Sequence, residues 1–196
     1  MSIVTEPELT SRLFTKDEFF LMADMGWFEN QRVEFIQGRI VDMAPVSNIH
    51  SIVVSLVQNA LNRVFDTRFW IRPQMALDFT DAFIVPDIAV VEGSPRSHIA
   101  KGKKNPESAA LVVEVSERSL TYDRGNKAKL CAAAGILDYW VVVLANRQVE
   151  VFRNPQAVEG DNGGFAYTEC TVYEGGDSIT PLAAPNASIP VADLLP

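Results

Sequence analysis

A continuous apolar run, AALVVEVS at residues 109–116, is the feature that most limits the fold of this chain. Strands buried on both faces have this pattern, whereas strands with one face in water alternate apolar and polar residues. An alanine-rich segment from about Tyr122 follows and ends at Gly135, which is typical of a helix with a glycine after its last turn. A second apolar run, LDYWVVVL at 137–144, comes next. This order predicts a sheet with a helix packed against it.

The remaining segments predict further strands and helices. Thr15 and Glu18 form a capping-box pattern before a short amphipathic helix, and residues 48–65 have the apolar spacing of a longer one. We expect a hairpin within 32–45 that turns near Gln37-Gly38, strands at 69–79, 82–92 and 147–153, a polar and basic loop at 94–108, and hairpin strands beyond 154. The predicted fold class is α/β, with a central mixed β-sheet flanked by helices and extra C-terminal β-hairpins.

One domain accounts for residues 1–196, with residues 1–12 as an N-terminal tail, because 196 residues of which 47% are hydrophobic can form one core. Two cysteines are too few for a disulfide framework. The sequence contains no signal peptide or membrane-spanning run, so we expect a cytoplasmic protein without membrane contact. The net charge of -8 argues against a broad basic surface for nucleic acid, but not against a local basic track around an acidic metal site.

Two carboxylates and a lysine stand out in the middle of the chain. Asp87 follows a proline inside an apolar strand, Glu114 lies inside the next apolar strand, and Lys127 lies on the following helix. Two buried carboxylates on neighbouring strands are costly, and a divalent cation such as Mg²⁺ relieves that cost because it takes oxygen ligands. A nearby lysine would orient water and offset charge on a phosphoryl group. Each residue alone has an ordinary structural explanation; the three together favour a site.

These residues resemble a known pattern. Pro86-Asp87, then Glu114, then a lysine, is similar to the PD-(D/E)XK nuclease superfamily. The closer resemblance is to the Uma-two family of restriction endonucleases, through VEFIQGRIVDMAP, VPDIAVVE, LVVEVSERSL, YDRGNKAKLCAAAGILDYWVVV and VEVFR, and through His50 at a helix start. The likeness runs from about residue 13 to the end of the chain. Cys131 and Val143 depart from the residues usual in the family, but neither is an expected metal ligand.

The resemblance implies a restriction-endonuclease-like fold, a homodimer, and hydrolysis of DNA phosphodiester bonds with Mg²⁺, or Mn²⁺ in its place, and no organic cofactor. It implies that Asp87 and Glu114 bind the metal together with the backbone carbonyl of Val115. The simple superfamily pattern has its lysine at position 116, where this chain has Ser116. In the family the lysine lies on the next helix, where Lys127 fits.

Further residues are candidates to support the site. Asp123 precedes Lys127 by one helical turn and is expected to hold it. Glu34 either completes the metal site or pairs with a neighbouring arginine, and His50 either points into the cleft or packs at the helix start. The weaker candidates are Gln74 and Ser116 beside the site, Lys129 as the alternative lysine, and Lys101, Lys103, Lys104, Arg118 and Arg124 as phosphate contacts.

Two other functions stay open at this point. The scaffold could serve as a non-catalytic module that binds nucleic acid or protein, because a fold does not guarantee an activity. The acidic net charge favours that interpretation, and the complete set of two acids and a lysine favours the enzyme. A nuclease for RNA or for a small nucleotide is the third hypothesis, since nothing in the sequence selects DNA.

Overall fold

The computed structural model describes residues 11–100, 102, 105–159 and 164–196. The helices are α1 (Lys16–Asp24), α2 (Asn48–Val64), α3 (Pro95–Ala100), α4 (Leu120–Tyr122), η1 (Asp123–Lys127, a π-helix), α5 (Ala128–Ala133) and η2 (Val191–Leu194, a 3-10 helix). The strands are β1 (Val33–Ile36), β2 (Arg39–Asp42), β3 (Phe69–Pro73), β4 (Leu77–Phe79), β5 (Ala82–Ile84), β6 (Ile88–Glu92), β7 (Leu111–Ser116), β8 (Asp138–Val143), β9 (Gln148–Val158), β10 (Gly164–Glu174), β11 (Ser178–Ile179) and β12 (Ile189–Pro190).

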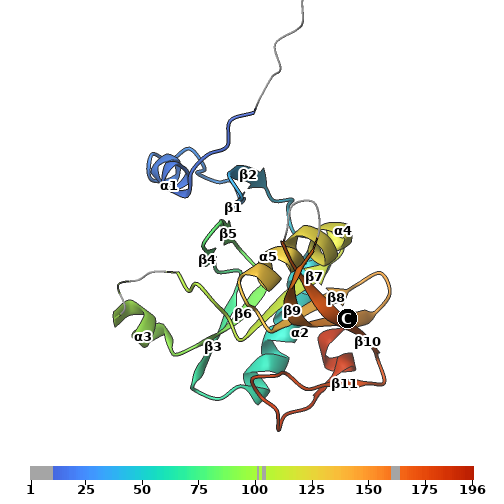
Figure 1. The fold of residues 1–196 in the computed structure, drawn as a ribbon. Helices are drawn as coiled ribbons and strands as arrows, with labels where there is room; N and C mark the ends of the chain where they lie inside the picture. Colours follow the sequence, from blue (N-terminus) through green and yellow to red (C-terminus); the bar gives the residue numbers. More distant parts are fainter. Residues whose placement is uncertain (1–10, 101, 103–104, 160–163) are drawn as a thin grey trace, which may run out of the picture.

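A six-stranded sheet forms the centre of the molecule, in the order β10-β9-β8-β7-β6-β3 (Figure 1). The strands β7 and β8 are parallel, and the other neighbouring pairs are antiparallel. This is the mixed sheet that the sequence predicts. All residues of β7 and β8 are buried, as the continuous apolar runs require.

Two apolar cores cover the two faces of this sheet. On one face α2 packs with β12 and η2, and the core contains Val57, Leu61 and Trp140. On the other face α5 packs with β4 and β5, which belong to a four-stranded sheet of order β2-β1-β5-β4. In Figure 1 this smaller sheet lies between α1 and the central sheet, and Phe19 of α1 packs against Phe35 of β1. The smaller sheet therefore lies where it can contribute side chains to the edge of the larger one.

The local signals at the two long helical segments have clear structural counterparts. The Thr15 hydroxyl oxygen accepts a hydrogen bond from the backbone N–H of Glu18, and the Glu18 carboxylate accepts one from the backbone N–H of Thr15, so the predicted capping box is confirmed. Ser47 is the N-cap of α2 and accepts from the backbone N–H of His50. This cap fixes the first turn of α2, and with it the position of His50.

Two predictions about the strands and loops are wrong in detail. The expected strand 69–79 breaks into β3 and β4, because Gln74 has φ of 48° and its backbone N–H donates to the carbonyl of Asp87. The segment 94–108, expected to be a loop, contains α3, whose start is held by Ser94 and Ser97 through reciprocal hydrogen bonds. Serine caps of this kind are short-range signals, and they initiate even a short helix.

The two cysteines differ in accessibility, and this gives a simple test of the fold. Cys131 is fully buried on α5, and burial raises the pKa of its thiol, whereas Cys170 is exposed on β10. We expect one thiol to react with Ellman's reagent in the native protein and two in denaturant, because the reactive species is an accessible thiolate. A native Cys170→Ser variant should show none; a rapidly reacting thiol in that variant would contradict the packing of α5.

Candidate active site

The N-terminal end of β6 and the middle of β7 bring two carboxylates together. Ile88 of β6 is paired with Val113 of β7, so the next position on each strand places Asp87 beside Glu114. Beyond this pair, a side chain takes the place of the backbone hydrogen bonds between β6 and β7. Asp87 Oδ2 accepts a hydrogen bond from the backbone N–H of Val115 at 2.8 Å. The backbone N–H of Asp87 lies 3.4 Å from Glu114 Oε2. The antiparallel register thus assembles the predicted pair of acids.

Lys127 lies buried between two glutamates. Its Nζ is 3.0 Å from Glu114 Oε1 and 3.3 Å from Glu34 Oε1. Glu34 comes from β1 of the smaller sheet and also accepts the backbone N–H of Val85 at 2.8 Å. The contact with Glu114 is an ion pair rather than a well-aligned hydrogen bond, because Oε1 has no partner of good geometry. Glu34 therefore pairs with Lys127 and not with Arg32 or Arg39, the arginine partners considered from the sequence.

A π-helical turn presents Lys127 to this site. The backbone N–H of Ala128 donates to the carbonyl of Asp123, five residues earlier, and the same carbonyl accepts the hydroxyl of Tyr139 at 2.9 Å. Single π turns inside α-helices are rare and frequent at functional sites. The ion pairs that Lys127 forms are with Glu34 and Glu114, and the charge of Lys127 also acts on the carboxyl of Asp123. That Asp123 holds the lysine stays a prediction.

Asp123 accepts a hydrogen bond from Ser119 Oγ at 2.5 Å. Burial raises the pKa of its carboxyl, and the hydrogen bond from Ser119 and the charge of Lys127 work in the opposite direction. Asp123 is therefore an acid at the wall of the site.

His50 lies at the open side of the carboxylate pair. Its Nε2 is 2.8 Å from Asp87 Oδ1, and this hydrogen bond raises the pKa of the imidazole against the effect of burial. Nearby, Ser47 Oγ donates to Glu117 Oε2 at 2.5 Å and links the start of α2 to the end of β7. Of the two interpretations left open by the sequence, the structure has the histidine in the cleft.

The electrostatic balance of the cluster is negative. Burial raises the pKa of Glu114 well above its usual value, Lys127 opposes this, and the neighbouring acids reinforce it. Burial alone would lower the pKa of Lys127, but Glu114, Glu34 and Asp87 outweigh burial and raise it well above the usual value. Lys127 is therefore an ammonium ion at neutral pH. The cluster contains four carboxyl groups and two basic side chains: Glu34, Asp87, Glu114, Asp123, Lys127 and His50.

The donor set fits a hard divalent cation in part. Ser116 Oγ is a buried oxygen without a hydrogen-bond partner, and Glu114 Oε1 has only the ammonium group of Lys127 beside it; a hard cation binds oxygens of this kind. Within the described ranges, however, no three His, Cys, Asp or Glu side chains are grouped as metal ligands. A backbone carbonyl could supply a further oxygen ligand. The carbonyl of Val115 is suited, because a strand residue directs its N–H and C=O to the same edge and the N–H of Val115 meets Asp87.

These groups open into a pocket of about 530 Å³. Of the predicted residues, the pocket is lined by Asp87, Glu114, Lys127, His50, Asp123 and Arg118. One wall is apolar and comes from the β2–α2 connection at 43–46 and from Val85. The lining of the pocket thus combines buried charged groups with apolar side chains.

Several predicted residues lie away from the pocket. Arg124 points from the π turn to Glu150 on β9 and pairs with it, so it is not a free phosphate contact. Gln74 does not line the pocket, and only its backbone contacts Asp87. Lys101, Lys103 and Lys104 lie outside the described residues.

Sequence reasoning missed three members of this site. Ser47 and Glu117 bridge its mouth, and Arg32 lines it beside Arg118. A serine directly before a helical pattern was a usable signal for Ser47. Nothing local marks Arg32 or Glu117, since both reach the pocket only through the pairing of distant segments.

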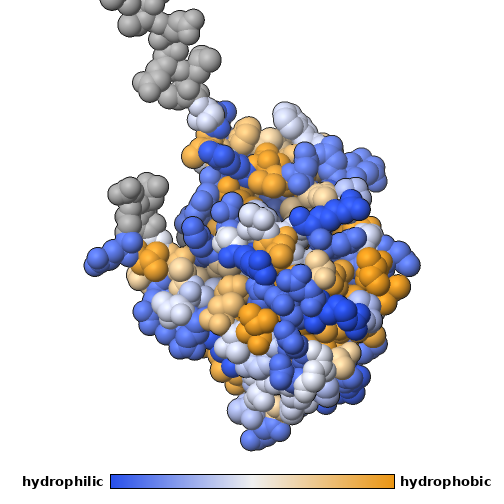
Figure 2. Space-filling model, turned by 90° about the vertical axis from the view of Figure 1, so that its right-hand side faces the viewer, coloured by the Kyte–Doolittle hydropathy of each residue, from blue (hydrophilic) through white to orange (hydrophobic). Residues whose placement is uncertain are grey.

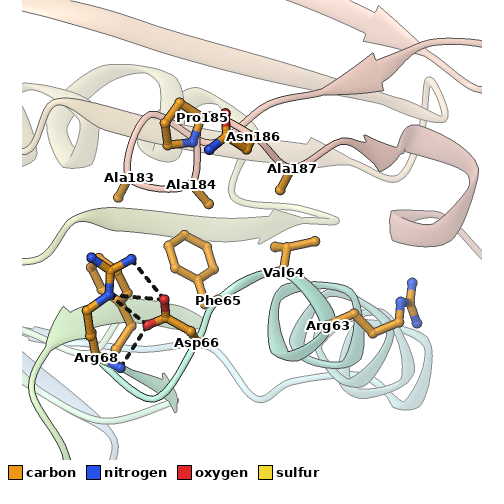
Figure 3. A pocket seen from close by; sticks show the side chains of 11 residues that line it. Arg63, Val64, Phe65, Asp66, Arg68, Ala183, Ala184, Pro185, Asn186 and Ala187 are labelled. Atoms are coloured by element: carbon orange, nitrogen blue, oxygen red, sulfur yellow. Dashed lines mark hydrogen bonds and ion pairs between the residues drawn. The ribbon is translucent and has the colours of Figure 1, made fainter.

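A second hollow of about 430 Å³ lies between the end of α2 and the loop at 183–187 (Figure 3). Its charged groups are already paired: Arg68 with Asp66, and Arg63 with Asp193. Its lining includes none of the buried acids described above. This hollow therefore lacks the buried charged groups of the pocket beside β6 and β7.

The part of the chain that the structure describes has no helix that is both long and apolar enough to cross a bilayer. A search of curated proteins finds no match. Among solved structures, a protein titled a "putative nuclease belonging to DUF820" from Anabaena variabilis matches with a TM-score of 0.68 and 20% identity, over 91% of this chain and 95% of that one. At this identity the likeness concerns the fold, and it confirms the predicted class of mixed sheet with flanking helices.

A family model gives the more direct relation. The model for Uma2, described as "Putative restriction endonuclease", matches residues 17–192. The matched range includes every residue of the site, from Glu34 to Lys127. The chain belongs to the Uma2 family of restriction-endonuclease-like proteins.

Proposed function

We propose that the protein is a metal-dependent endonuclease that hydrolyses phosphodiester bonds in DNA. The observation that supports this best is the convergence of Asp87, Glu114 and Lys127 in one pocket, from three elements that are separate in the sequence. The family description and the nuclease title of the structural neighbour point to the same class of reaction.

The roles of the residues follow from their surroundings. Asp87 and Glu114, with the Val115 carbonyl, would hold Mg²⁺ or Mn²⁺, which when bound supplies Lewis-acid charge stabilisation at a phosphoryl group. Lys127 would orient water and offset charge on the phosphoryl oxygens, and its ion pair with Glu34 would hold it in place.

One observation favours the alternative of a non-catalytic binding module on the same scaffold. Both oxygens of Asp87 already accept or share hydrogen bonds, with His50 and with Val115. A cation must compete with these contacts. A module of this kind need not bind Mg²⁺ or Mn²⁺, so equilibrium metal binding separates the two functions.

The first test is cleavage of supercoiled plasmid and single-stranded DNA. We expect nicking or cutting with Mg²⁺ or Mn²⁺ and none in excess EDTA, because two acids without a cation leave the phosphoryl charge uncompensated. Gel assays over a range of metal concentrations measure it. Glu169→Gln, which changes an exposed glutamate on β10, is the control variant for substitution of a site acid such as Glu114→Gln.

Activity that persists in EDTA would contradict the metal dependence. A repeated absence of cleavage across metals and substrates, together with an absence of metal binding by calorimetry, would favour the binding module. RNA of the same sequence as the DNA strand tests the choice of substrate, since nothing in the pocket is specific for deoxyribose.

Two further properties belong to the proposal. We place the protein in the cytoplasm, because its two cysteines are both unpaired.

We also propose a homodimer. The exposed apolar side chains of the β9–β10 hairpin, which are Val158, Phe165 and Val172, are compatible with a contact between copies. Light scattering after size-exclusion chromatography gives the mass that decides this.

A further inference from the structure

We propose that the pocket receives a single nucleotide that is unpaired and unstacked, so that the substrate is single-stranded nucleic acid or a strand opened at a junction or mismatch, and not an intact duplex. This inference rests on the proposed function and specifies its substrate class. It follows from the depth of the acids, from the apolar residues that line the same pocket, and from the two arginines in its lining.

The reactive groups lie too deep for a duplex. The exposed fractions of Asp87, Glu114 and Lys127 are 7%, 3% and 2%. A pocket of about 530 Å³ is in the range that accepts one small organic ligand, and a nucleotide is of that size. A duplex is a stiff rod whose bases are stacked inside, so its backbone cannot fold into such a pocket without local opening.

The apolar part of the lining suits the face of a base. Met43, Ala44, Pro45 and Val46 line the same pocket as the acids, and Val46 is exposed. Extruded bases commonly pack against apolar or aromatic side chains while the chemistry proceeds next to them. The acids and Lys127 would then face the phosphate.

The apolar surface continues along α2 outside the pocket, through Ile49 and Ile52, which are both exposed. Aliphatic side chains in such positions can enter the gap that an extruded base leaves. On the face of the molecule drawn in Figure 2, apolar and hydrophilic side chains are interspersed.

Two arginines offer positive charge to the phosphates of a short segment of nucleic acid. Arg32 and Arg118 line the pocket, and neither forms an ion pair within the residues that the structure describes. A protein that binds a duplex through its backbone can neutralise on the order of 6–10 phosphates. Among the described residues, the two arginines in the lining of this pocket match one or two phosphates.

The test compares three fluorescent DNA substrates of one sequence: a single strand, a fully paired duplex, and a duplex with one mismatched pair. Anisotropy with Ca²⁺, which we use to limit turnover, measures binding, and gel assays with Mg²⁺ measure cleavage. We expect the single strand to bind and to be cut at least roughly tenfold better than the paired duplex, with the mismatch in between, because extrusion from a paired stack costs free energy. Equal or better use of the paired duplex overturns the inference.

Two variants test the walls of the pocket. Arg32→Ala and Val46→Ser should each weaken binding of the single strand by roughly tenfold, as expected for a lost phosphate contact or a lost base contact. Arg96→Ala and Ile99→Ser on α3 are the matched controls, since both residues are exposed and neither lines the pocket. Equal losses in the α3 variants, or no loss in the pocket variants, would overturn the assignment of these walls.

Hydrolysis of bis(p-nitrophenyl) phosphate separates this inference from the proposed function. If the small diester is hydrolysed and Glu114→Gln abolishes it, but no preference for single strands appears, the inference fails and the nuclease stands. If the single strand is bound preferentially through Arg32 and nothing is hydrolysed, the inference stands and the proposed catalysis fails. Absence of both overturns both.

Discussion

Replacing Lys127 by methionine is expected to destabilise the protein by about 3–5 kcal/mol, because the change leaves Glu34 and Glu114 buried without their positive partner. Methionine nearly preserves the length of the side chain, so the loss measures charge rather than packing. In a domain of this size, 1 kcal/mol shifts the melting temperature by roughly 2–4 °C. A decrease of roughly 6–20 °C by calorimetry is therefore the expected result.

The matched control is Lys129→Met, because Lys129 is an exposed lysine two residues further along the same helix. It should leave both the melting temperature and cleavage unchanged, which also decides between the two candidate lysines. A triple variant with Lys127→Met, Glu34→Gln and Glu114→Gln should recover most of the lost stability and none of the activity. If the triple variant is as unstable as the single one, the loss is due to packing and the electrostatic explanation is wrong.

Glu114→Gln is expected to reduce cleavage by roughly 100- to 1,000-fold or more, a range typical for loss of one group that stabilises transition-state charge. The same change should leave the melting temperature of the metal-free protein unchanged or raise it, because it removes an acid whose pKa is raised by burial among other acids. Activity is therefore expected to fall while stability is kept or increased, as in other sites whose activity is gained at the expense of stability.

Cleavage at the wild-type rate in Glu114→Gln would remove this carboxylate from the site. A large decrease of the melting temperature would instead show that Glu114 serves the fold through its pairing with Lys127. Both readouts are needed, since loss of activity with unfolding would say nothing about catalysis.

The sequence predicts the central strands of the sheet well, because strands buried on both faces are continuous apolar runs. The buried run in β7 and the spacing in α2 are local signals, and both elements are present with nearly the expected bounds. The helix α3 escapes the prediction because its signal is a pair of serines within a basic stretch. The break at Gln74 depends on a bond to Asp87, which belongs to another strand.

The site could be predicted only in part, for the same reason. Asp87 and Glu114 are recognisable because acids are unusual in apolar strands, and Lys127 is recognisable only through the family pattern in which it follows them. The pairing of Lys127 with Glu34 is not readable, because it joins β1 of the smaller sheet to a turn far along the chain. The π turn is not readable either, since the alanine-rich pattern predicts an ordinary α-helix in this segment.

The origin of the site in both sheets has a consequence for synthesis on the ribosome. Its charged groups extend from Arg32 to Lys127, and β8, which pairs with β7, follows only after that. Long-range pairings of this kind form slowly, and the N-terminal end of a chain leaves the ribosome first. An incomplete chain that stops before Lys127 contains both carboxylates but neither the ammonium ion that pairs with Glu114 nor the strand that pairs with β7. For the proposed nuclease, truncated translation products would therefore be harmless to the genome of the cell that makes them.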